Sequence, residues 1–364
     1  MQTKVEVKTK LQLLNIGKKV AVGLSGGVDS AVSAVLLKRA GFDVVAVNMK
    51  CWSNQDGSEC EADIDRKIAI QVAENIGIPI KVWDFEKEYR QKVIEYFIDE
   101  IKKGRTPNPD VVCNKEIKFD LFLNKALKEL KVDFVATGHY ARILGDNGTY
   151  KLLKGVDETK DQSYFLHRLN QYQLSKTLFP VGHLTKKEVR ELADEFELIN
   201  KDKKDSVGIC FIGEVDIAEF LKKHITQKVG VIKNLSGEVI GQHIGVWFYT
   251  IGQRHGFTIN KYLGKPMYVV KKDVENNELV VGDTVDTNSL SFGVEDIHYI
   301  FEGAKEILDN LEVDIRIRHL GVLIKGVVKG GVVTSLEKMF NAVASGQSVV
   351  FYKDDVVLGG AVIK

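Results

Sequence analysis

A loop of mostly small residues, Gly23-Leu24-Ser25-Gly26-Gly27-Val28-Asp29-Ser30, lies between a predicted strand and a predicted helix. Before it, Val20, Ala21 and Val22 form an apolar run typical of a buried strand, and residues 31–40 carry apolar side chains at helical spacing. Small residues at such a junction let backbone N–H groups approach an anion, and the helix N-terminus adds partial positive charge. A short glycine-rich string can also be a plain turn, but the whole stretch after an apolar strand predicts a phosphate-binding loop.

Length and composition limit the classes of protein to consider. The chain has 364 residues, of which 44% are hydrophobic and 28% charged, as in ordinary globular proteins, and its length predicts two or three domains. No apolar run reaches the ~18–20 residues of a membrane helix, and residues 1–8 lack the apolar core of a signal peptide. We therefore expect a cytoplasmic protein. The net charge of +1 does not by itself indicate a nucleic-acid binder.

The four cysteines, Cys51, Cys60, Cys113 and Cys210, are too few and too scattered for a disulfide-stapled secreted fold. There is no CxxC pair, so we predict no metal site built by the protein. In a reducing compartment each cysteine is by default a buried, inert thiol. Only Cys113 and Cys210 depart from that default, because of the sequences around them.

Strand and helix patterns alternate in the first part of the chain. Predicted strands at 43–49, 79–83 and 133–137 alternate with predicted helices at 61–76, 86–103 and 117–130. Residues 104–116 break the pattern, and a further helix at 184–196 opens with the capping-box spacing of Thr185 and Glu188. Such alternation predicts an α/β fold with a doubly wound parallel sheet, whose ligands bind beyond the carboxyl ends of the strands.

Beyond residue 225 the predicted segments become short, β-rich and punctuated by glycine. The texture predicts a small α+β central domain followed by a C-terminal antiparallel β-barrel. We place the domains at 1–210, 211–284 and 285–364.

The two unusual cysteines lie in irregular segments. In residues 104–114 two prolines flank Asn108, which stiffens the segment, disfavours a helix and would present Asp110 and Cys113 in fixed positions. In residues 205–213 glycines bracket the pair Cys210-Phe211, as a mobile segment with a reactive thiol would require. Taken singly, residues 104–114 favour a structural turn with a buried cysteine, and residues 205–213 favour a strand with a core cysteine.

Six motifs together are far more specific than any one of them. They are SGGVDS at 25–30, GRTPNPDVVCN at 104–114, ATGHYAR at 136–142, KDQSYFL at 160–166, DSVGICFIG at 205–213 and YTIGQRHG at 249–256. The first resembles the loop of the ATP-pyrophosphatase superfamily, which grips the pyrophosphate of ATP and transfers AMP to a substrate oxygen. The whole series resembles the bacterial tRNA-specific 2-thiouridylase family, whose members put sulfur on the wobble uridine of tRNA.

The resemblance implies a role for each matched residue. It assigns the phosphates of ATP to Gly23–Ser30 and its adenosine to Met49 and Gly138. It makes Cys210 the carrier of a persulfide, Cys113 the partner thiol that forms a disulfide with it, and Asp110 the acid/base group. The residues implied to contact the target base or other parts of the tRNA are Asn108, Pro109, Asp110, His139, Lys160, Asp161, Gln162, Arg316, Ile317 and Gln347.

The implied reaction adenylates the C2 carbonyl oxygen of uridine and then replaces it with sulfur from the Cys210 persulfide, releasing AMP and pyrophosphate. The resemblance also implies ATP with Mg²⁺, tRNA of the Lys, Glu and Gln type, and a sulfur-donor protein, which is a cysteine desulfurase or a relay protein. It implies a monomer that does not bind membranes.

Two other functions remain open at this point. An amidating synthetase with the same loop would need no cysteine pair, and a non-catalytic tRNA-binding or sulfur-carrier protein would need no intact loop. Single residues also have plainer interpretations. His139 could be a core histidine, residues 160–162 a solvated turn, and Arg316 part of an exposed strand face.

Overall fold

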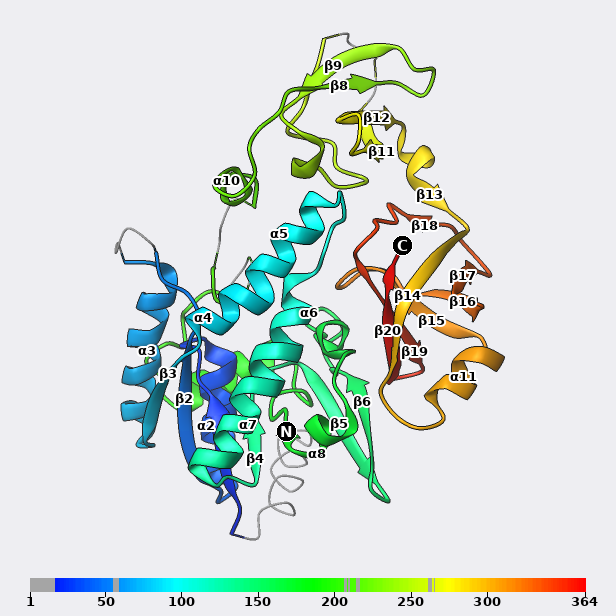
Figure 1. Cartoon of the computed structure of the whole chain (residues 1–364). Coiled ribbons are helices and arrows are strands. Elements are labelled where there is room, and N and C mark those ends of the chain that lie inside the picture. Colours follow the sequence, from blue (N-terminus) through cyan, green and yellow to red (C-terminus); the bar gives the residue numbers. More distant parts are fainter. Residues whose placement is uncertain are drawn as a thin grey trace.

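The computed structural model describes residues 17–54, 59–205, 208, 210–213, 217–260, 264 and 266–364. Figure 1 shows an α/β unit, a small β-rich unit beyond the end of helix α5 (Glu95–Lys102), and a barrel beside the α/β unit. Within these described residues, no helix combines the length and the apolar character needed to cross a membrane.

A five-stranded parallel sheet forms the centre of the α/β unit, in the order β3-β2-β1-β4-β7. Its strands are β1 Lys19–Gly23, β2 Asp43–Lys50, β3 Ile80–Asp84, β4 Phe134–Ala136 and β7 Thr177–Leu178. Side chains of β1 alternate between two hydrophobic clusters: Val20 and Val22 pack with helices α2 (Val28–Arg39), α3 (Glu61–Ile76) and α9 (Lys186–Glu195), whereas Ala21 faces the other cluster. The predicted doubly wound parallel sheet is confirmed.

The local signals of the α/β unit also agree with the structure. Helix α3 has the predicted bounds, and the capping box before α9 is present. There the N–H of Glu188 donates to the Thr185 hydroxyl at 3.2 Å, and the N–H of Thr185 donates to the Glu188 carboxylate at 2.8 Å. A capping box satisfies two backbone donors that the first turn leaves unpaired.

The prediction of an irregular segment at 104–116 is wrong from residue 109 onward. Helix α6 (Pro109–Cys113) begins at the second proline and continues through η2 (Asn114–Phe122), α7 (Leu123–Lys125) and η3 (Ala126–Leu130). The side chain of Asn108 caps the helix by accepting the N–H of Val111 at 3.3 Å. Proline is tolerated at the first helical position because its missing N–H would be unpaired there anyway. The two prolines therefore mark a helix start.

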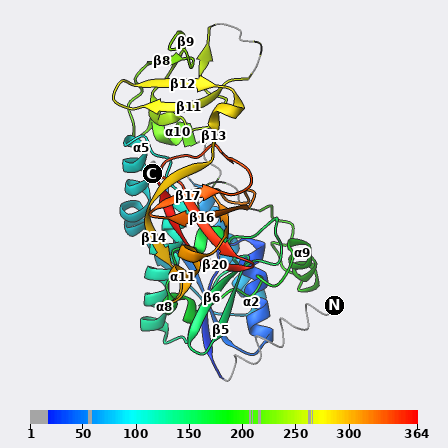
Figure 2. The same cartoon turned by 90° about the vertical axis from the view of Figure 1, so that its right-hand side faces the viewer.

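The second long helix of the unit is also composite. It runs through α4 (Glu86–Tyr89), η1 (Arg90–Ile94) and α5, which carries it to the β-rich unit. Residues of α5 share one hydrophobic cluster with that unit, and the Trp247 indole N–H donates to the Lys102 carbonyl at 3.0 Å. Figure 2 shows the β-rich unit at the same end of the molecule.

The β-rich unit contains helix α10 (Ile217–Lys222) and a five-stranded sheet in the order β10-β9-β8-β12-β11. The strands are β8 Gly230–Lys233, β9 Val239–His243, β10 Thr258–Ile259, β11 Tyr268–Asp273 and β12 Glu278–Gly282. The small α+β character is as predicted.

The C-terminal part is the predicted antiparallel barrel. Its strands are β14 Ser291–Tyr299, β15 Val313–Arg316, β16 Ile324–Lys329, β17 Val332–Ser335, β19 Ser348–Lys353 and β20 Val356–Ile363, and pairing of β14 with β20 closes it. The sequence patterns did not predict the hairpin β5 (Ala141–Asp146) and β6 (Thr149–Lys154), which extends this sheet from the α/β unit. Leu153 of β6 pairs with Val356 of β20. The hairpin thus joins the barrel to the α/β unit.

Candidate active site

A cavity of about 500 Å³ lies beyond the carboxyl ends of β1, β2 and β4. Parallel sheets bind ligands at this edge. The predicted site residues that line it are Gly23, Leu24, Ser25, Gly27, Val28, Asp29, Ser30, Met49, Asp110, Gly138, His139, Lys160, Gln162 and Cys210. The predicted loop, one of the two cysteines and Asp110 therefore share a single cavity.

Other predicted residues lie outside the cavity lining. They are Gly26, Asn108, Pro109, Cys113, Asp161, Arg316, Ile317 and Gln347. Cys113 is fully buried, whereas Gln347 is half-buried in the turn before β19.

The loop after β1 is ordered by its own serines. The Ser30 hydroxyl donates to the Gly27 carbonyl at 2.9 Å and lies 3.2 Å from the Ser25 hydroxyl, which accepts the Gly27 N–H at 3.3 Å. Two glycines are needed for steric reasons. Gly26 has φ +88 and a side-chain carbon there would lie 2.3 Å from the Asp65 carbonyl oxygen, while one on Gly138 would lie 2.7 Å from the Ser30 nitrogen. Gly138 thereby lets the end of β4 pack against the start of α2.

Polar and charged groups surround Asp29, the carboxylate of the loop. Asp29 accepts hydrogen bonds from the Tyr140 hydroxyl at 2.8 Å and from the Lys186 ammonium at 2.7 Å. Lys186 also contacts Asp205 at 2.7 Å, and Asp205 pairs in addition with Lys160 at 2.6 Å and Arg190 at 2.8 Å. Although burial opposes it, Lys160 and Lys186 hold the pKa of Asp205 well below its ordinary value. The Asp205 carboxylate thus forms ion pairs with three cations beside the cavity.

The two predicted cysteines meet. Both thiols are free, and the Cys113 and Cys210 side chains are hydrogen-bond partners. The hydrogen bond from Cys113, followed by the nearby Lys118 ammonium, lowers the pKa of Cys210 to about 7 against the opposing effect of burial. Burial raises the pKa of Cys113 well above its ordinary value. Cys210 is therefore the sulfur that ionises first, and Cys113 stays a thiol behind it.

The backbone of Cys210 is fixed on both sides. Its N–H donates to the Asp110 carboxylate at 3.0 Å, and its carbonyl accepts the Tyr89 hydroxyl at 2.6 Å. The next residue, Phe211, adopts a left-handed backbone with φ 68 and packs edge-on against Tyr89. Burial raises the pKa of Asp110, although the N–H of Cys210 opposes this shift. A buried carboxyl with a raised pKa is suited to proton transfer.

His139 lines the cavity and is otherwise enclosed. Its Nδ1 lies 2.7 Å from the Thr137 hydroxyl, and its ring packs against Phe119 and Phe179. Burial, assisted by the charge of Lys118, lowers the pKa of His139 well below its ordinary value. The imidazole is thus neutral near pH 7.

The segment before α6 is where the three parts of the molecule meet. The Thr106 N–H donates to the Ser345 carbonyl of the barrel at 2.7 Å, and its hydroxyl lies 3.3 Å from that of Thr250 in the β-rich unit. The side chain of Tyr164 contacts Asn108, and its hydroxyl donates to the Ser348 carbonyl at 2.7 Å. The segments that carry Asn108 and Gln347, two of the residues predicted to contact tRNA, therefore lie next to each other.

Arg316 occupies a different environment from the exposed strand face considered above. It forms an ion pair with Asp161 at 2.8 Å, and the two side chains are 9% and 2% exposed. Asp161 also accepts the N–H groups of Gly155 and Ser163 at 3.0 and 3.1 Å. The pair connects the barrel to the α/β unit.

Sequence reasoning missed several residues of the site. They are Lys118, Tyr89, Tyr140 and Lys186, together with Asp205, which opens a motif but received no role. Lys118 gives no signal of its own, because a lysine in a predicted helix is usually a solvated side chain. Only the observation that the helix starts at Pro109 places Lys118 on the same helix as Cys113.

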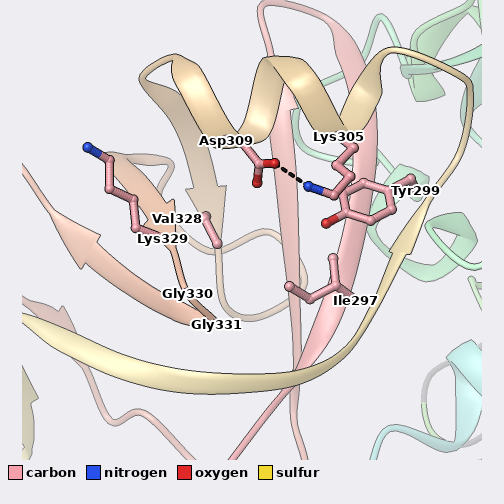
Figure 3. A pocket seen from close by; sticks show the side chains of 8 residues that line it. All are labelled: Ile297, Tyr299, Lys305, Asp309, Val328, Lys329, Gly330 and Gly331. Carbon is pink, nitrogen blue, oxygen red and sulfur yellow. Dashed lines mark hydrogen bonds and ion pairs between the residues drawn. The ribbon is translucent and has the colours of Figure 1, made fainter.

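A second cavity of about 440 Å³ lies on the barrel, between α11 (Ala304–Asn310) and the strands beside it (Figure 3). Its lining contains an ion pair between Lys305 and Asp309 of the same helix and none of the predicted site residues. The cavity beside β1 is therefore the candidate active site.

Comparison with known proteins agrees with this architecture. Residues 18–214 match the family described as tRNA methyl transferase HUP domain, residues 218–283 the tRNA methyl transferase PRC-barrel domain, and residues 289–363 the aminomethyltransferase beta-barrel domain.

Whole-length relatives are similar over nearly the entire chain. The tRNA-specific 2-thiouridylase MnmA of Geobacillus thermodenitrificans is 46% identical over 351 residues, covering 95% of this chain and 94% of its own. One of two such proteins of Geobacillus kaustophilus is 48% identical over 354 residues, covering 95% of each chain. Among solved structures, the U34-tRNA thiolase NcsA of Methanococcus maripaludis covers 61% of this chain and 72% of its own, at 22% identity and a TM-score of 0.37. On the evidence of its near-full-length relatives, the chain belongs to the tRNA-specific 2-thiouridylase family.

Proposed function

We propose that this protein catalyses the ATP-dependent 2-thiolation of the wobble uridine of tRNA, in tRNAs of the Lys, Glu and Gln type. Membership of the 2-thiouridylase family supports the reaction class. The observation that carries the proposal for the site is that Cys210 lines the same cavity as the Gly23–Ser30 loop, with Cys113 in hydrogen-bond contact behind it.

The first step activates the uridine. The C2 oxygen attacks the α-phosphorus of ATP, a new P–O bond forms, and the bond to the β-phosphate breaks to release pyrophosphate. Backbone N–H groups of the loop and the start of α2 would hold the departing phosphates. Asp110 would accept the N3 proton of the base, so that the electron pair reaches the C2 oxygen.

The second step replaces the oxygen. A persulfide on Cys210 attacks C2 with its terminal sulfur, and AMP leaves with the former carbonyl oxygen. Cys113 then loses its proton and attacks the Cys210 sulfur, which forms the Cys113–Cys210 disulfide and releases the thiolated base. An external dithiol would reduce that disulfide, and a persulfide-bearing donor protein would reload Cys210. The thiol contact and the higher pKa of Cys113 support this order.

ATP is a substrate here, and Mg²⁺ would enter with it. Mg²⁺ is usually bound through one or two carboxylates and the phosphates of the substrate. Among the described residues no group of three or more metal-ligating side chains forms a separate cage, and Asp29 is the loop carboxylate that fits such a role. Met49 and Gly138 would border the adenosine.

The tRNA would reach the cavity across the junction of the three parts. Asn108 and Pro109 lie at the start of α6, and the Ile317 and Gln347 regions meet that segment through Tyr164 and Ser345. His139, Lys160 and Gln162 line the cavity itself. The uridine must leave the anticodon stack to enter it. We retain 1–210, 211–284 and 285–364 as the proposed domains.

The proposal is tested by incubating the protein with ATP, unmodified tRNA, a cysteine desulfurase with its relay protein, and ³⁵S-cysteine. Nucleosides are then separated and identified by mass spectrometry. We expect labelled 2-thiouridine at the wobble position only when ATP is present, together with AMP and pyrophosphate in equal amounts. Labelled base without ATP, or ATP cleavage without thiolated base, would contradict the proposal.

A further inference from the structure

Lys118 lies next to both cysteines although no motif points to it. It belongs to η2, one turn beyond Cys113 on the same continuous helix, and its side chain lines the cavity that Cys210 also lines. One helix therefore places the Cys113 thiol and the Lys118 ammonium near the turn that carries Cys210.

The contacts of Lys118 point to a sulfur anion. Its ammonium nitrogen lies 5.5 Å from the centre of the Phe211 ring, and its side chain is a hydrogen-bond partner of Cys210. Among the residues that the structure describes, no carboxylate lies within ion-pair distance of Lys118. Asp110 lies beyond that distance and acts on Lys118 less than Cys210 does, so the half-buried ammonium needs a closer anion.

We propose that Lys118 is a catalytic residue of sulfur transfer, whose ammonium holds the sulfur of Cys210 as an anion, first as thiolate and then as persulfide. The proposal rests on the proposed thiolation function and adds a residue to it. The donor protein carries its sulfur as a persulfide, R–S–SH. The Cys210 thiolate attacks the terminal sulfur, a new S–S bond forms, the old one breaks, and R–S⁻ departs with its electron pair and takes up the proton of the transferred sulfur. The loaded Cys210–S–S⁻ then faces the activated C2.

The other groups that act on the ionisation of Cys210 carry no positive charge that could stabilise its sulfur anion. Asp110 is negative and raises the pKa of Cys210, while Cys113 and Cys51 are thiols and Tyr89 is a phenol, all with raised pKa values from burial. Cys113 donates a hydrogen bond but has no positive charge. Although burial opposes it, Cys210, Cys113 and Asp110 raise the pKa of Lys118, so the ammonium keeps its proton.

The test measures the pH dependence of Cys210 alkylation by iodoacetamide, with the labelled peptide followed by mass spectrometry. Lys118→Met removes the charge but keeps the length of the side chain, Lys118→Arg keeps the charge, and Lys115→Met changes an exposed lysine of the same helix. We expect the alkylation midpoint to rise by about one pH unit in Lys118→Met. Lys118→Arg and Lys115→Met should keep the wild-type midpoint. A wild-type midpoint in a folded Lys118→Met protein would overturn the proposal.

A second measurement uses the wild-type protein and does not depend on how the variant folds. Lys118 is acetylated with acetic anhydride before and after Cys210 is capped with iodoacetamide. Capping removes the anion, so the pKa of Lys118 should fall and its acetylation at pH 8 should become faster. An unchanged rate would count against the proposal.

Neither measurement contains tRNA or ATP, so the outcome separates two failures. A shifted midpoint in a protein that does not thiolate tRNA would reject the proposed function and retain the contact between Lys118 and Cys210. An unshifted midpoint in an enzyme that thiolates tRNA would reject only the role of Lys118. In the active enzyme, Lys118→Met should also move the acid limb of the thiolation profile to higher pH and leave the KM for ATP unchanged.

Discussion

The carboxylate of Asp110 accepts the backbone N–H of Cys210 at 3.0 Å, which ties the first turn of α6 to the turn that carries the second cysteine. Cys113 ends the same short helix, so one helical turn positions the proposed acid/base group and both thiols. This hydrogen bond does not involve either thiol. Variants can therefore test it separately from the contact between Cys113 and Cys210.

Asp110→Asn should separate the positioning of Cys210 from proton transfer. The amide oxygen can still accept the N–H of Cys210, so persulfide loading should persist, while tRNA thiolation should fall by about 10²-fold or more because the general base is lost. Loading is measured as protein-bound ³⁵S and thiolation as labelled tRNA. Asp110→Ala, which also removes the acceptor, should lose loading as well. Full thiolation by Asp110→Asn would exclude Asp110 as the base.

The two cysteines should fail at different steps. Cys210→Ser should hold no protein-bound sulfur and make no 2-thiouridine, but it should still adenylate tRNA. Cys113→Ala should load sulfur and attack the base, and then, without an added thiol, remain joined to the tRNA through Cys210. A gel shift that dithiothreitol reverses would reveal this adduct. Cys60→Ser is the matched control and should behave as wild type. Efficient turnover by Cys113→Ala without added thiol would exclude the disulfide step.

Sulfur loading should depend on pH around 7. The pKa of Cys210 is lowered to about 7 by the hydrogen bond from Cys113 and by Lys118, and the thiolate is the form that attacks the donor. Below pH 7 the sulfur is protonated, so the loading rate should fall about tenfold per pH unit, whereas it should level off above pH 8. Rates of ³⁵S loading between pH 5.5 and 9 check this. A rate still rising steeply at pH 9 would indicate an ordinary thiol.

Lys186→Met should weaken ATP binding. Lys186 pairs with both Asp29 and Asp205 beside the loop, so its loss leaves Asp29 without this cation near the triphosphate, whereas Asp205 keeps Lys160 and Arg190. We expect the KM for ATP to rise about tenfold, with a smaller effect on kcat. The exposed neighbour offers the control variant Lys187→Met, which should leave the KM unchanged. Equal KM values in the two variants would show that the ion-pair cluster does not serve ATP.

Arg316→Met should destabilise the protein. The change leaves the nearly buried Asp161 without its partner, and the expected loss is about 3 kcal/mol of unfolding free energy. Urea unfolding followed by circular dichroism measures the loss, and the double variant with Asp161→Asn should recover part of it. A variant of unchanged stability but raised KM for tRNA would instead favour the tRNA contact implied by the family resemblance.

Much of the fold could be predicted because its signals are local. The apolar strand Val20–Val22, the capping box at Thr185 and the period of α3 each depend on neighbouring residues. The hairpin β5–β6 was not predicted, because β6 pairs with β20, a strand that is distant in sequence. The prolines around Asn108 were misinterpreted because a proline that breaks a helix and one that starts it look alike in sequence.

The site was predictable only in part, for a similar reason. Gly23–Ser30 and the two cysteines carry distinctive sequences, and the structure brings the loop, Cys210 and Cys113 together. Lys118 and Lys186 are ordinary lysines in helices, and only tertiary contacts place them beside Cys210 and Asp29. An exposed strand face was one interpretation of Arg316, but the residue is buried. The sequence around an arginine on a strand does not show that a distant residue, here Asp161, forms an ion pair with it.

The most direct test of the account is a single turnover without free sulfur donor. The protein is loaded with ³⁵S, freed of donor, and mixed with unmodified tRNA in the presence or absence of ATP. We predict that the label moves from the Cys210 peptide to 2-thiouridine only with ATP, while one Cys113–Cys210 disulfide forms for each labelled base. Transfer from a peptide other than that of Cys210, or transfer without ATP, would contradict the account.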